Sequence, residues 1–185
     1  MLKRYCISSG HGWLLPGAIG ILNEVHEARR VVDRVTLELT TRGHEVVVFH
    51  DNDSTNVPDN INAIVRAHRA TGSRCCDVSV HFNAFDNPQA RGVETLYLRD
   101  DDEKLASRMS HAIAKAGDMP VRQPQGGATL MGAQRRGNLG FLAQLRSNPT
   151  ILLEVCFVTS QRDADAYNEN FEAICVAIAD ELEKV

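Results

Sequence analysis

The first strand-and-helix unit of the chain reads, from Arg4 to Val32, RYCISSGHGWLLPGAIGILNEVHEARRVV. Its short run Tyr5–Ser8 is typical of a strand, and a helical pattern begins near Asn23. Apolar residues then recur at steps of three and four, which places them on one stripe of a helix. Gly43 follows, as glycine often does just past a helix end. The stretch predicts a strand, a glycine-rich connection and a helix over Asn23–Arg42.

The same alternation continues along the chain. Further strands are predicted by short β-branched runs at Glu45–His50, Asp77–His81, Gly92–Leu98 and Thr150–Phe157. Helices are predicted at Val57–Ala70, Glu103–Ala116 and Glu169–Lys184. The stretch Met119–Asn148 is rich in Gly, Gln and Arg, and within it only Thr129–Met131 predicts a further short strand. Alternating strands and helices favour a mixed, mostly parallel sheet with helices on both faces. We therefore expect one three-layer α/β domain over residues 1–185, with about five to six strands.

The composition is that of an ordinary globular protein. The chain has 185 residues, of which 43% are apolar and 24% charged, values that exclude disordered and fibrous classes. A net charge of −4 gives no electrostatic reason to expect nucleic acid as a partner. No apolar run approaches the roughly 20 residues of a membrane helix, and no apolar segment of the signal-peptide type follows Met1–Arg4. We expect a soluble monomer, made in the cytoplasm and not inserted in a membrane.

Cysteine usage indicates neither a disulfide framework nor a cysteine zinc site. The count is five, an odd number, and no C-x-x-C pair occurs. Cys6 and Cys156 lie inside strand-like runs, where cysteine behaves as a small apolar residue. We interpret the adjacent Cys75 and Cys76 as thiols.

Several common motifs are absent. The glycines around His11 are followed by no Lys-Ser or Lys-Thr, which excludes a phosphate-binding P-loop, and the dinucleotide pattern G-x-G-x-x-G fails at Leu15. The nucleophile elbow G-x-S-x-G and the zinc helix motif H-E-x-x-H are also missing.

Polar residues do stand where the predicted strands end, which is where ligands bind in open α/β sheets. Zinc can be held by two histidines and a glutamate from separate elements, with one position left open. His11, Glu24 and His81 offer this set. Gly10 and Gly12 let the backbone bend and free the His11 ring. Glu24 lies in the first turn of a helix, where the dipole favours its ionised form.

Alternatives remain for each histidine, because a histidine at a strand end is often only a hydrogen-bonded boundary group. We expect His26, His68 and His111 to be solvated on helices, and His44 to open a strand. His50-Asp51 either borders the site or forms a plain strand-end turn.

Glu154 interrupts the apolar run Ile151–Val158, which is typical of a buried central strand. Burying an unpaired carboxylate costs several kcal/mol, so Glu154 requires a cation, a set of donors or a catalytic role. One alternative is an ion pair with Arg135 or Arg136. We favour catalysis, because this strand end faces the candidate metal ligands.

Three separated motifs, in order and over nearly the whole chain, resemble the zinc-dependent N-acetylmuramoyl-L-alanine amidases of the type 3 family. They are Gly10-His11-Gly12 with Pro16-Gly17-Ala18 and Asn23-Glu24, then Val80-His81-Phe82-Asn83-Ala84, and then Leu153-Glu154-Val155-Cys156-Phe157. Many members read D-P-G-H-G-G where this chain has Ser8-Ser9 before Gly10, and Asn where Ser160 stands. We expect these departures to affect substrate contacts rather than the chemistry.

The resemblance implies one zinc ion (Zn²⁺) per chain, with His11, Glu24 and His81 as ligands and Glu154 as catalytic acid and base. It implies a mixed sheet flanked by helices, and peptidoglycan as substrate, cut between the muramoyl lactyl group and the first L-Ala of the stem peptide. We add Asn83 as a group that orients His81 or contacts substrate.

The resemblance also bears on where the enzyme acts. We expect an endolysin-type catalytic domain of a phage or prophage, which acts on the cell wall after release, or an enzyme of mother-cell lysis. No cell-wall-binding module is visible in the sequence. Two other classes stay open: a different zinc peptidase or deacylase on a related fold, and a non-catalytic peptidoglycan-binding domain. The presence of all four candidate residues argues against the second.

Overall fold

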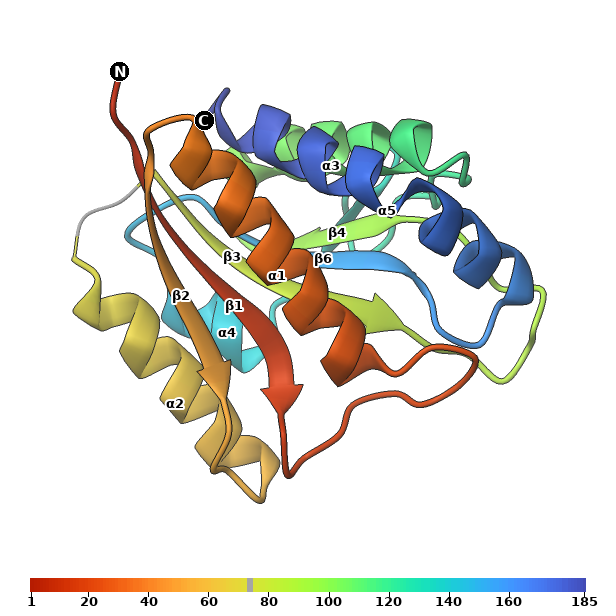
Figure 1. Ribbon diagram of the computed structural model, residues 1–185, viewed down its shortest axis with the longest axis horizontal. Coiled ribbons are helices and arrows are strands. Elements are labelled where there is room, and N and C mark those ends of the chain that lie inside the picture. The colour runs from red at the N-terminus through yellow and green to blue at the C-terminus, as the bar shows by residue number, and fades with distance from the viewer. Residues whose placement is uncertain (73–74) are drawn as a thin grey trace.

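The computed structural model describes residues 1–72 and 75–185. Its sheet has the strand order β2-β1-β3-β6-β4-β5 (Figure 1). Four neighbouring strands are parallel: β2 (Glu45–Asp51), β1 (Arg4–Gly12), β3 (Cys76–Asn83) and β6 (Thr150–Phe157). The strand β4 (Glu94–Tyr97) is antiparallel to β6, and β5 (Ala133–Arg135) is parallel to β4. The predicted mixed, mostly parallel sheet is confirmed.

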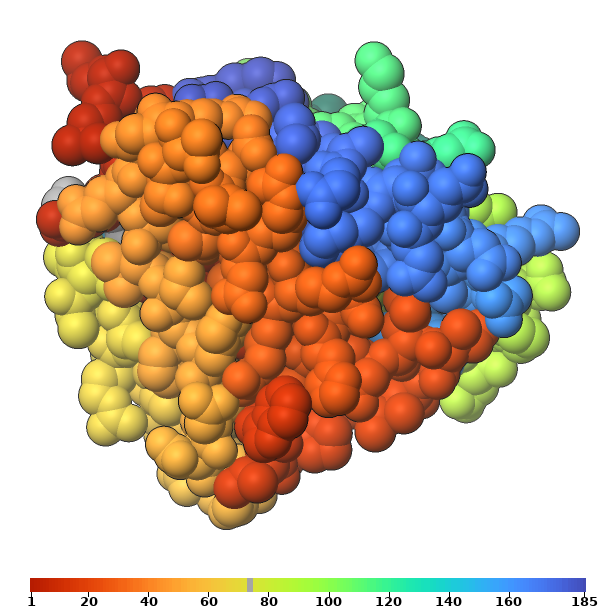
Figure 2. Space-filling view, viewed as in Figure 1, coloured from red at the N-terminus to blue at the C-terminus, as the bar shows by residue number. Residues whose placement is uncertain are grey.

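Helices cover both faces of the sheet, as expected for this class. One face carries α1 (Glu24–Thr41), α3 (Glu103–Ala116) and α5 (Gln161–Leu182), and the other carries α2 (Val57–Ala70) and α4 (Gly140–Gln144) (Figure 1). Figure 2 shows α1 and α5 packed side by side over the first face. Arg42, the C-cap residue of α1, joins them through its ion pair with Asp180 of α5, 2.7 Å long. In the described parts of the chain, no helix has the length and apolar character needed to cross a membrane.

The helix α1 follows its sequence pattern closely. Asn23 caps its start by accepting a hydrogen bond from the backbone N–H of His26, 3.2 Å long, and this cap fixes Glu24 in the first turn. The predicted apolar stripe is buried against the sheet: Val25, Ala28, Val32, Val35 and Leu39. The cap fixes where α1 begins, and the buried stripe fixes which face of α1 packs on the sheet. Together they place Glu24 at the edge of the sheet.

Two local predictions of secondary structure are wrong. The last helix begins at Gln161 rather than at Glu169, and non-helical dihedral angles at Asn170 divide it. Ser160 caps this helix by accepting a hydrogen bond from the backbone N–H of Asp163. A serine just before a helical run is a start signal that can be read in the sequence. Thr129–Met131 is not a strand, and the edge strand β5 begins only at Ala133.

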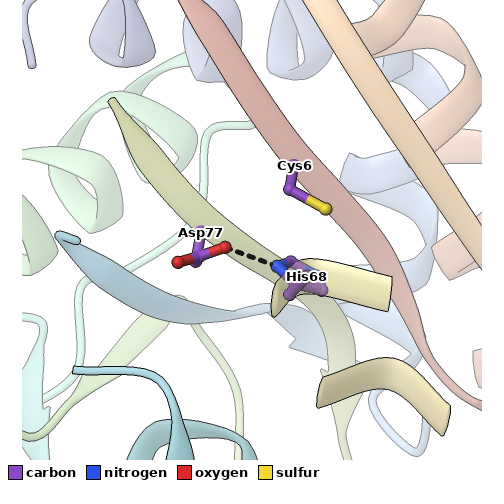
Figure 3. A group of neighbouring side chains, drawn as sticks. All are labelled: Cys6, His68 and Asp77. Carbon is purple, nitrogen blue, oxygen red and sulfur yellow. Dashed lines mark hydrogen bonds and ion pairs between the residues drawn. The ribbon is translucent and has the colours of Figure 1, made fainter. Parts of the chain in front are cut away.

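His68 is fully buried, and the prediction that it is solvated is wrong. Figure 3 shows its ring turned toward Asp77 of β3, with Cys6 of β1 beside the pair. Nδ1 of His68 donates to Oδ1 of Asp77 over 2.6 Å, and its Nε2 lies 3.0 Å from the hydroxyl of Ser8. Asn148 donates to the second oxygen of Asp77 over 3.2 Å. A buried carboxylate needs such donors, so this polar cluster ties α2 to the sheet.

Replacing His68 by alanine should lower the free energy of unfolding by about 3–5 kcal/mol, because Asp77 would keep a buried charge without its main donor. Urea unfolding followed by circular dichroism measures the change. The exposed His111 is the control, and its alanine variant should stay within about 0.5 kcal/mol of the original chain. Converting His68 and Asp77 together to leucine should recover part of the loss. Equal unfolding midpoints for the His68 and His111 variants would contradict this account.

Candidate metal centre

Three side chains from separate elements meet at the carboxyl end of the parallel strands. His11 comes from β1, Glu24 from the first turn of α1 and His81 from β3. Oε1 of Glu24 lies 3.3 Å from Nε2 of His11 and 3.0 Å from Nδ1 of His81. One ligand-type atom from each residue lies within 4.8 Å of the other two. The fold therefore brings the predicted ligand set together.

Glu24 is the centre of this group. It is 3% exposed, and its two oxygens also accept backbone hydrogen bonds from Ala18, at 2.7 Å, and from Phe82, at 3.1 Å. Burial by itself would raise the pKa of Glu24, but the hydrogen bonds from His11 and His81 outweigh burial and hold this pKa well below its usual range. The carboxylate is thus ionised, which is the form that binds a metal.

The distances fit a tetrahedral zinc ion. Zinc lies about 2.0–2.1 Å from nitrogen and oxygen ligands, so two ligands of one tetrahedral ion are about 3.3 Å apart. The contacts of Glu24 with His11 and His81 are close to this value. The cluster of Cys6, His68 and Asp77 also gathers ligand-type atoms. There the 2.6 Å contact between His68 and Asp77 is a charge-assisted hydrogen bond. It is shorter than the distance of about 3.3 Å between two ligands of one tetrahedral ion.

The backbone at His11 is strained. His11 has a φ of 59°, in the left-handed region that costs most residues about 1–2 kcal/mol. The pairing of β1 with β2 shifts register between Ser8 and Gly12, which marks a bulge at this point. The left-handed φ therefore lies on His11 itself, within a bulge that also contains Gly10. Strain of this kind is typical of functional sites.

Gly10 and Gly17 matter to the candidate metal centre because they have no Cβ atom. A Cβ atom on Gly10 would collide with the ring of His81, and one on Gly17 would collide with the carboxylate of Glu24. Both glycines therefore leave space for a candidate ligand. Gly12 differs, because a Cβ there would make only an ordinary 3.4 Å contact with Asp51.

Glu154 lies in the same row of the sheet. It pairs in register with His81 on β3 and with Glu94 on β4. Its Oε2 is buried and has no hydrogen-bond partner among the residues that the structure describes. Burial, and then the nearby charges of Glu24 and Glu94, raise the pKa of Glu154 well above its usual range.

The alternative ion pair for Glu154 is wrong. Arg135 binds Asp100 at 2.8 Å, and Arg136 contacts Gln125 at 3.2 Å. Neither arginine contributes to the charge balance of Glu154.

Glu94 was missed by the sequence analysis, although it carries the same signal as Glu154, a carboxylate inside an apolar strand. It accepts from Nδ2 of Asn83 at 2.7 Å and from Arg122 at 3.0 Å. Oδ1 of Asn83 accepts from the N–H of Ala84 at 2.9 Å. Both polar atoms of Asn83 thus have partners inside the protein, and its contact with substrate stays a prediction.

The remaining candidates at this edge have structural partners. His50 contacts the hydroxyl of Ser9 at 2.8 Å, and Oδ1 of Asp51 accepts from the backbone of Ser54 at 3.1 Å, which is the plain strand-end turn that the sequence left open. Trp13 is 53% exposed on the loop after β1, with its ring stacked on that of His26.

A cavity of about 300 Å³ opens beside the candidate metal centre, between the sheet and the two helices α2 and α4. We call it the α2–α4 cavity. His11, His81 and Glu154 line it, together with apolar residues of both helices and of the sheet. The wall from α4 was not predicted, because residues 140–144 show no clear helical pattern.

Comparison with known proteins places these features in context. The family model for N-acetylmuramoyl-L-alanine amidase, Amidase_3, matches residues 6–184. A curated relative, the uncharacterized 38.4 kDa protein of Clostridium perfringens, is 24% identical over 170 residues. This match covers 90% of the chain and 46% of the relative, so the chain spans less than half the length of that protein.

Solved structures share the fold over its whole extent. The catalytic domain of CD27L endolysin targeting Clostridia Difficile has a TM-score of 0.82 at 20% identity, covering 98% of this chain and 97% of that one. The catalytic domain of CwlV, an N-acetylmuramoyl-L-alanine amidase from Bacillus (Paenibacillus) polymyxa var. colistinus, has a TM-score of 0.80 at 23% identity, covering 99% and 97%. The amidase AmiC2 of Nostoc punctiforme has a TM-score of 0.75 at 25% identity, covering 98% and 96%.

The two glycines that flank His11 provide a test of this geometry. In the Gly10→Ala variant the new methyl group should displace the His81 ring, and zinc affinity should fall by at least about tenfold, the usual cost of disturbing a ligand's support. Competition with a fluorescent chelator measures the affinity. Gly12→Ala is the matched control and should bind zinc like the original chain. Equal zinc affinities for the two variants would contradict the role given to Gly10.

Proposed function

This chain belongs to the N-acetylmuramoyl-L-alanine amidase family, and we propose that it hydrolyses peptidoglycan at the amide between the muramoyl lactyl group and the first L-alanine of the stem peptide. One observation supports this most strongly. His11, Glu24 and His81 bring ligand-type atoms together, and His11 and His81 line a cavity with Glu154, whose Oε2 has no hydrogen-bond partner among the described residues. That arrangement suits hydrolysis of an amide better than binding alone.

We propose that His11, Glu24 and His81 hold one zinc ion. When bound, zinc would supply a Lewis acid that polarises the scissile carbonyl and activates water. The chain contributes an ionised Glu24, fixed by backbone donors from Ala18 and Phe82, so the ligand set is preorganised.

Glu154 has the role of general base and then of general acid. Its carboxylate takes a proton from the attacking water as the new C–O bond forms, and then passes that proton to the departing amine as the amide C–N bond breaks. Its burial suits this role, because a raised pKa brings a carboxyl group nearer to the pH at which it must exchange a proton. The neighbouring Glu94 is held by Asn83 and Arg122, and it fixes the strand beside Glu154.

The place of action follows from the proposed substrate. Peptidoglycan forms the cell wall, and we propose that the enzyme reaches it on lysis, as an endolysin does. The likeness to the CD27L endolysin domain supports this assignment through the fold.

Digestion of purified peptidoglycan tests the reaction. The zinc-loaded chain should release new amino termini of L-alanine without new reducing sugar ends, as measured by amine labelling and mass spectrometry. A chelator should stop the release, and added zinc should restore it. The reason is that the proposed zinc ion would be held only by protein side chains, so that it can be removed and replaced. New reducing ends without new amino termini would indicate a glycosidase, and release at another peptide bond would indicate a different zinc peptidase.

Glu154→Gln tests the acid–base role. The variant should keep its zinc, because Glu154 is not in the ligand set, while kcat falls by at least about a hundredfold, as when a general acid–base group is lost. Zinc content by atomic absorption separates the two effects. Glu172→Gln, an exposed exchange on α5, is the control and should keep full activity. Wild-type turnover in Glu154→Gln would refute the assignment.

A further inference from the structure

We propose that the exposed ring of Trp13 is a platform on which a sugar ring of the glycan strand stacks. The inference rests on the proposed function, because it takes the muramoyl group as the part of the substrate that carries the scissile amide. It adds a binding site outside both the candidate metal centre and the α2–α4 cavity. The site would give the enzyme a preference for stem peptides that are still attached to their sugars.

Helix α1 holds the ring of Trp13 in one position. The ring stacks on the imidazole of His26, with 5.2 Å between the ring centroids and an angle of 9° between the ring planes. The guanidinium carbon of Arg29 lies 5.0 Å from the centroid of the Trp13 ring, which is a cation–π contact. His26 and Arg29 are three residues apart, so they lie on one side of α1 and support the same face of the ring. The opposite face is left to solvent, and the Trp13 residue is 53% exposed.

The end of β2 anchors both the ring and its support. The backbone N–H of Trp13 donates to the carbonyl oxygen of Asp51 over 2.9 Å. Arg29 donates to the same oxygen over 2.6 Å and to Oδ1 of Asn52 over 2.8 Å. An aromatic ring that is already fixed loses little conformational freedom when a ligand covers it, which favours binding. The platform is thus preorganised.

The platform lies on the side of the candidate metal centre that is opposite to Glu154. In the sheet, β1 and β2 lie on one side of β3, and β6 lies on the other side. Glu154 of β6 protonates the departing amine in the proposed reaction, so the stem peptide lies on the β6 side. The acyl part of the substrate then lies on the side of β1 and β2, where Trp13 binds Asp51.

The distances allow a sugar to reach the platform. Trp13 is two residues from His11, so their Cα atoms are at most about 7 Å apart. In a muramoyl peptide, one carbon and one ether oxygen of the lactyl group join the scissile carbonyl to the sugar ring. When that carbonyl is at the candidate metal centre, the adjoining sugars of the strand are therefore within reach of Trp13.

The chemistry of the platform suits a sugar. One face of a pyranose ring carries C–H groups, which pack on the electron-rich face of an aromatic ring. The hydroxyl and acetamido groups at the rim of the sugar need hydrogen-bond partners. Arg29 and the exposed Asn52 supply polar groups beside the ring of Trp13. A lipid chain could use the ring but would leave these polar groups without partners.

Tryptophan fluorescence tests the platform directly, because Trp13 is the one tryptophan of the chain. Chitotriose, a trimer of N-acetylglucosamine without an amide to the stem peptide, is titrated into the zinc-loaded chain. The emission should shift to shorter wavelength and saturate, because the sugar excludes water from the ring. The free dipeptide L-Ala-D-Glu should leave the emission unchanged. No saturable shift with chitotriose, or the same shift with the dipeptide, overturns the inference.

Removing the ring tests its role in hydrolysis. For Trp13→Ala, kcat/KM should fall about tenfold on a disaccharide peptide, mainly through KM, because a stacking contact of about 1.4 kcal/mol is lost. The value should stay unchanged on a lactoyl peptide, which keeps the amide and has no sugar. Trp13→Phe should retain most of the activity on the disaccharide peptide, because it keeps an aromatic face. An equal loss on both substrates would mean that Trp13 only supports His11, and overturns the inference.

Leu37→Ala is the matched control for these measurements. Leu37 is also an exposed apolar residue, but it lies roughly 16 Å further along α1 than His26. Its alanine variant should keep both kcat/KM values and the fluorescence shift with chitotriose. A loss in this variant equal to that in Trp13→Ala contradicts a platform at Trp13.

Binding and turnover together separate this inference from the proposed function. If the disaccharide peptide is cleaved while chitotriose shifts nothing, the inference fails and the hydrolysis stands. If no amide is cleaved while chitotriose shifts the emission, the hydrolysis fails and Trp13 stands as a sugar-binding site.

Discussion

The buried carboxylate of Glu24 is the constraint on which the rest of the site depends. An ionised carboxylate this deeply buried is unfavourable unless several donors or a cation surround it. Here two backbone N–H groups, from Ala18 and Phe82, hold its oxygens, and two imidazoles approach from the open side. The loop after β1, the cap of α1 and the end of β3 must all be in place for this arrangement to form. The geometry of the site is thus fixed by folding rather than by a flexible loop.

The sheet registers explain why Glu154 belongs to the same site although it lies far from Glu24 in the sequence. β3 and β6 are adjacent and parallel, so His81 and Glu154 stand side by side at one level. β4 then adds Glu94 at this level from the antiparallel direction. Carboxyl groups gathered in one row repel one another, and Glu94 is stabilised there as an acceptor of hydrogen bonds from Asn83 and Arg122, while its charge still raises the pKa of Glu154. Glu154 has no such donor for its Oε2 among the described residues, which is why we propose it as the carboxyl that exchanges a proton.

Much of this was readable from the sequence, for identifiable reasons. The limits of α2, α3 and β6 were predicted as observed, because periodic apolar residues and flanking glycines marked them clearly. The positions of His11, His81 and Glu154 followed from the rule that parallel strands end at one edge, and that of Glu24 from its place in the first turn of the helix after the first strand. The short elements β5 and α4 were missed, since their stability comes from tertiary contacts rather than from local pattern. His68 was misjudged for a related reason: its partners, Ser8 and Asp77, come from two other elements, and a helical pattern alone cannot reveal them.

Contacts inside the protein explain why this chain has Ser8-Ser9 before Gly10 where many members of the family have Asp-Pro. Ser8 and Ser9 stand where many members of the family have Asp-Pro, and both are fully buried, so the expectation that they alter substrate contacts is wrong. Ser8 bonds to His68 and Ser9 to His50. A carboxylate at position 8 would lie beside Asp77 and would have to share the single imidazole of His68, and a proline at position 9 could offer no hydroxyl to His50. The two serines and the two histidines therefore form matched pairs on opposite faces of the sheet: Ser8 pairs with His68 of α2, and Ser9 pairs with His50, which also contacts Asp33 of α1 at 3.2 Å.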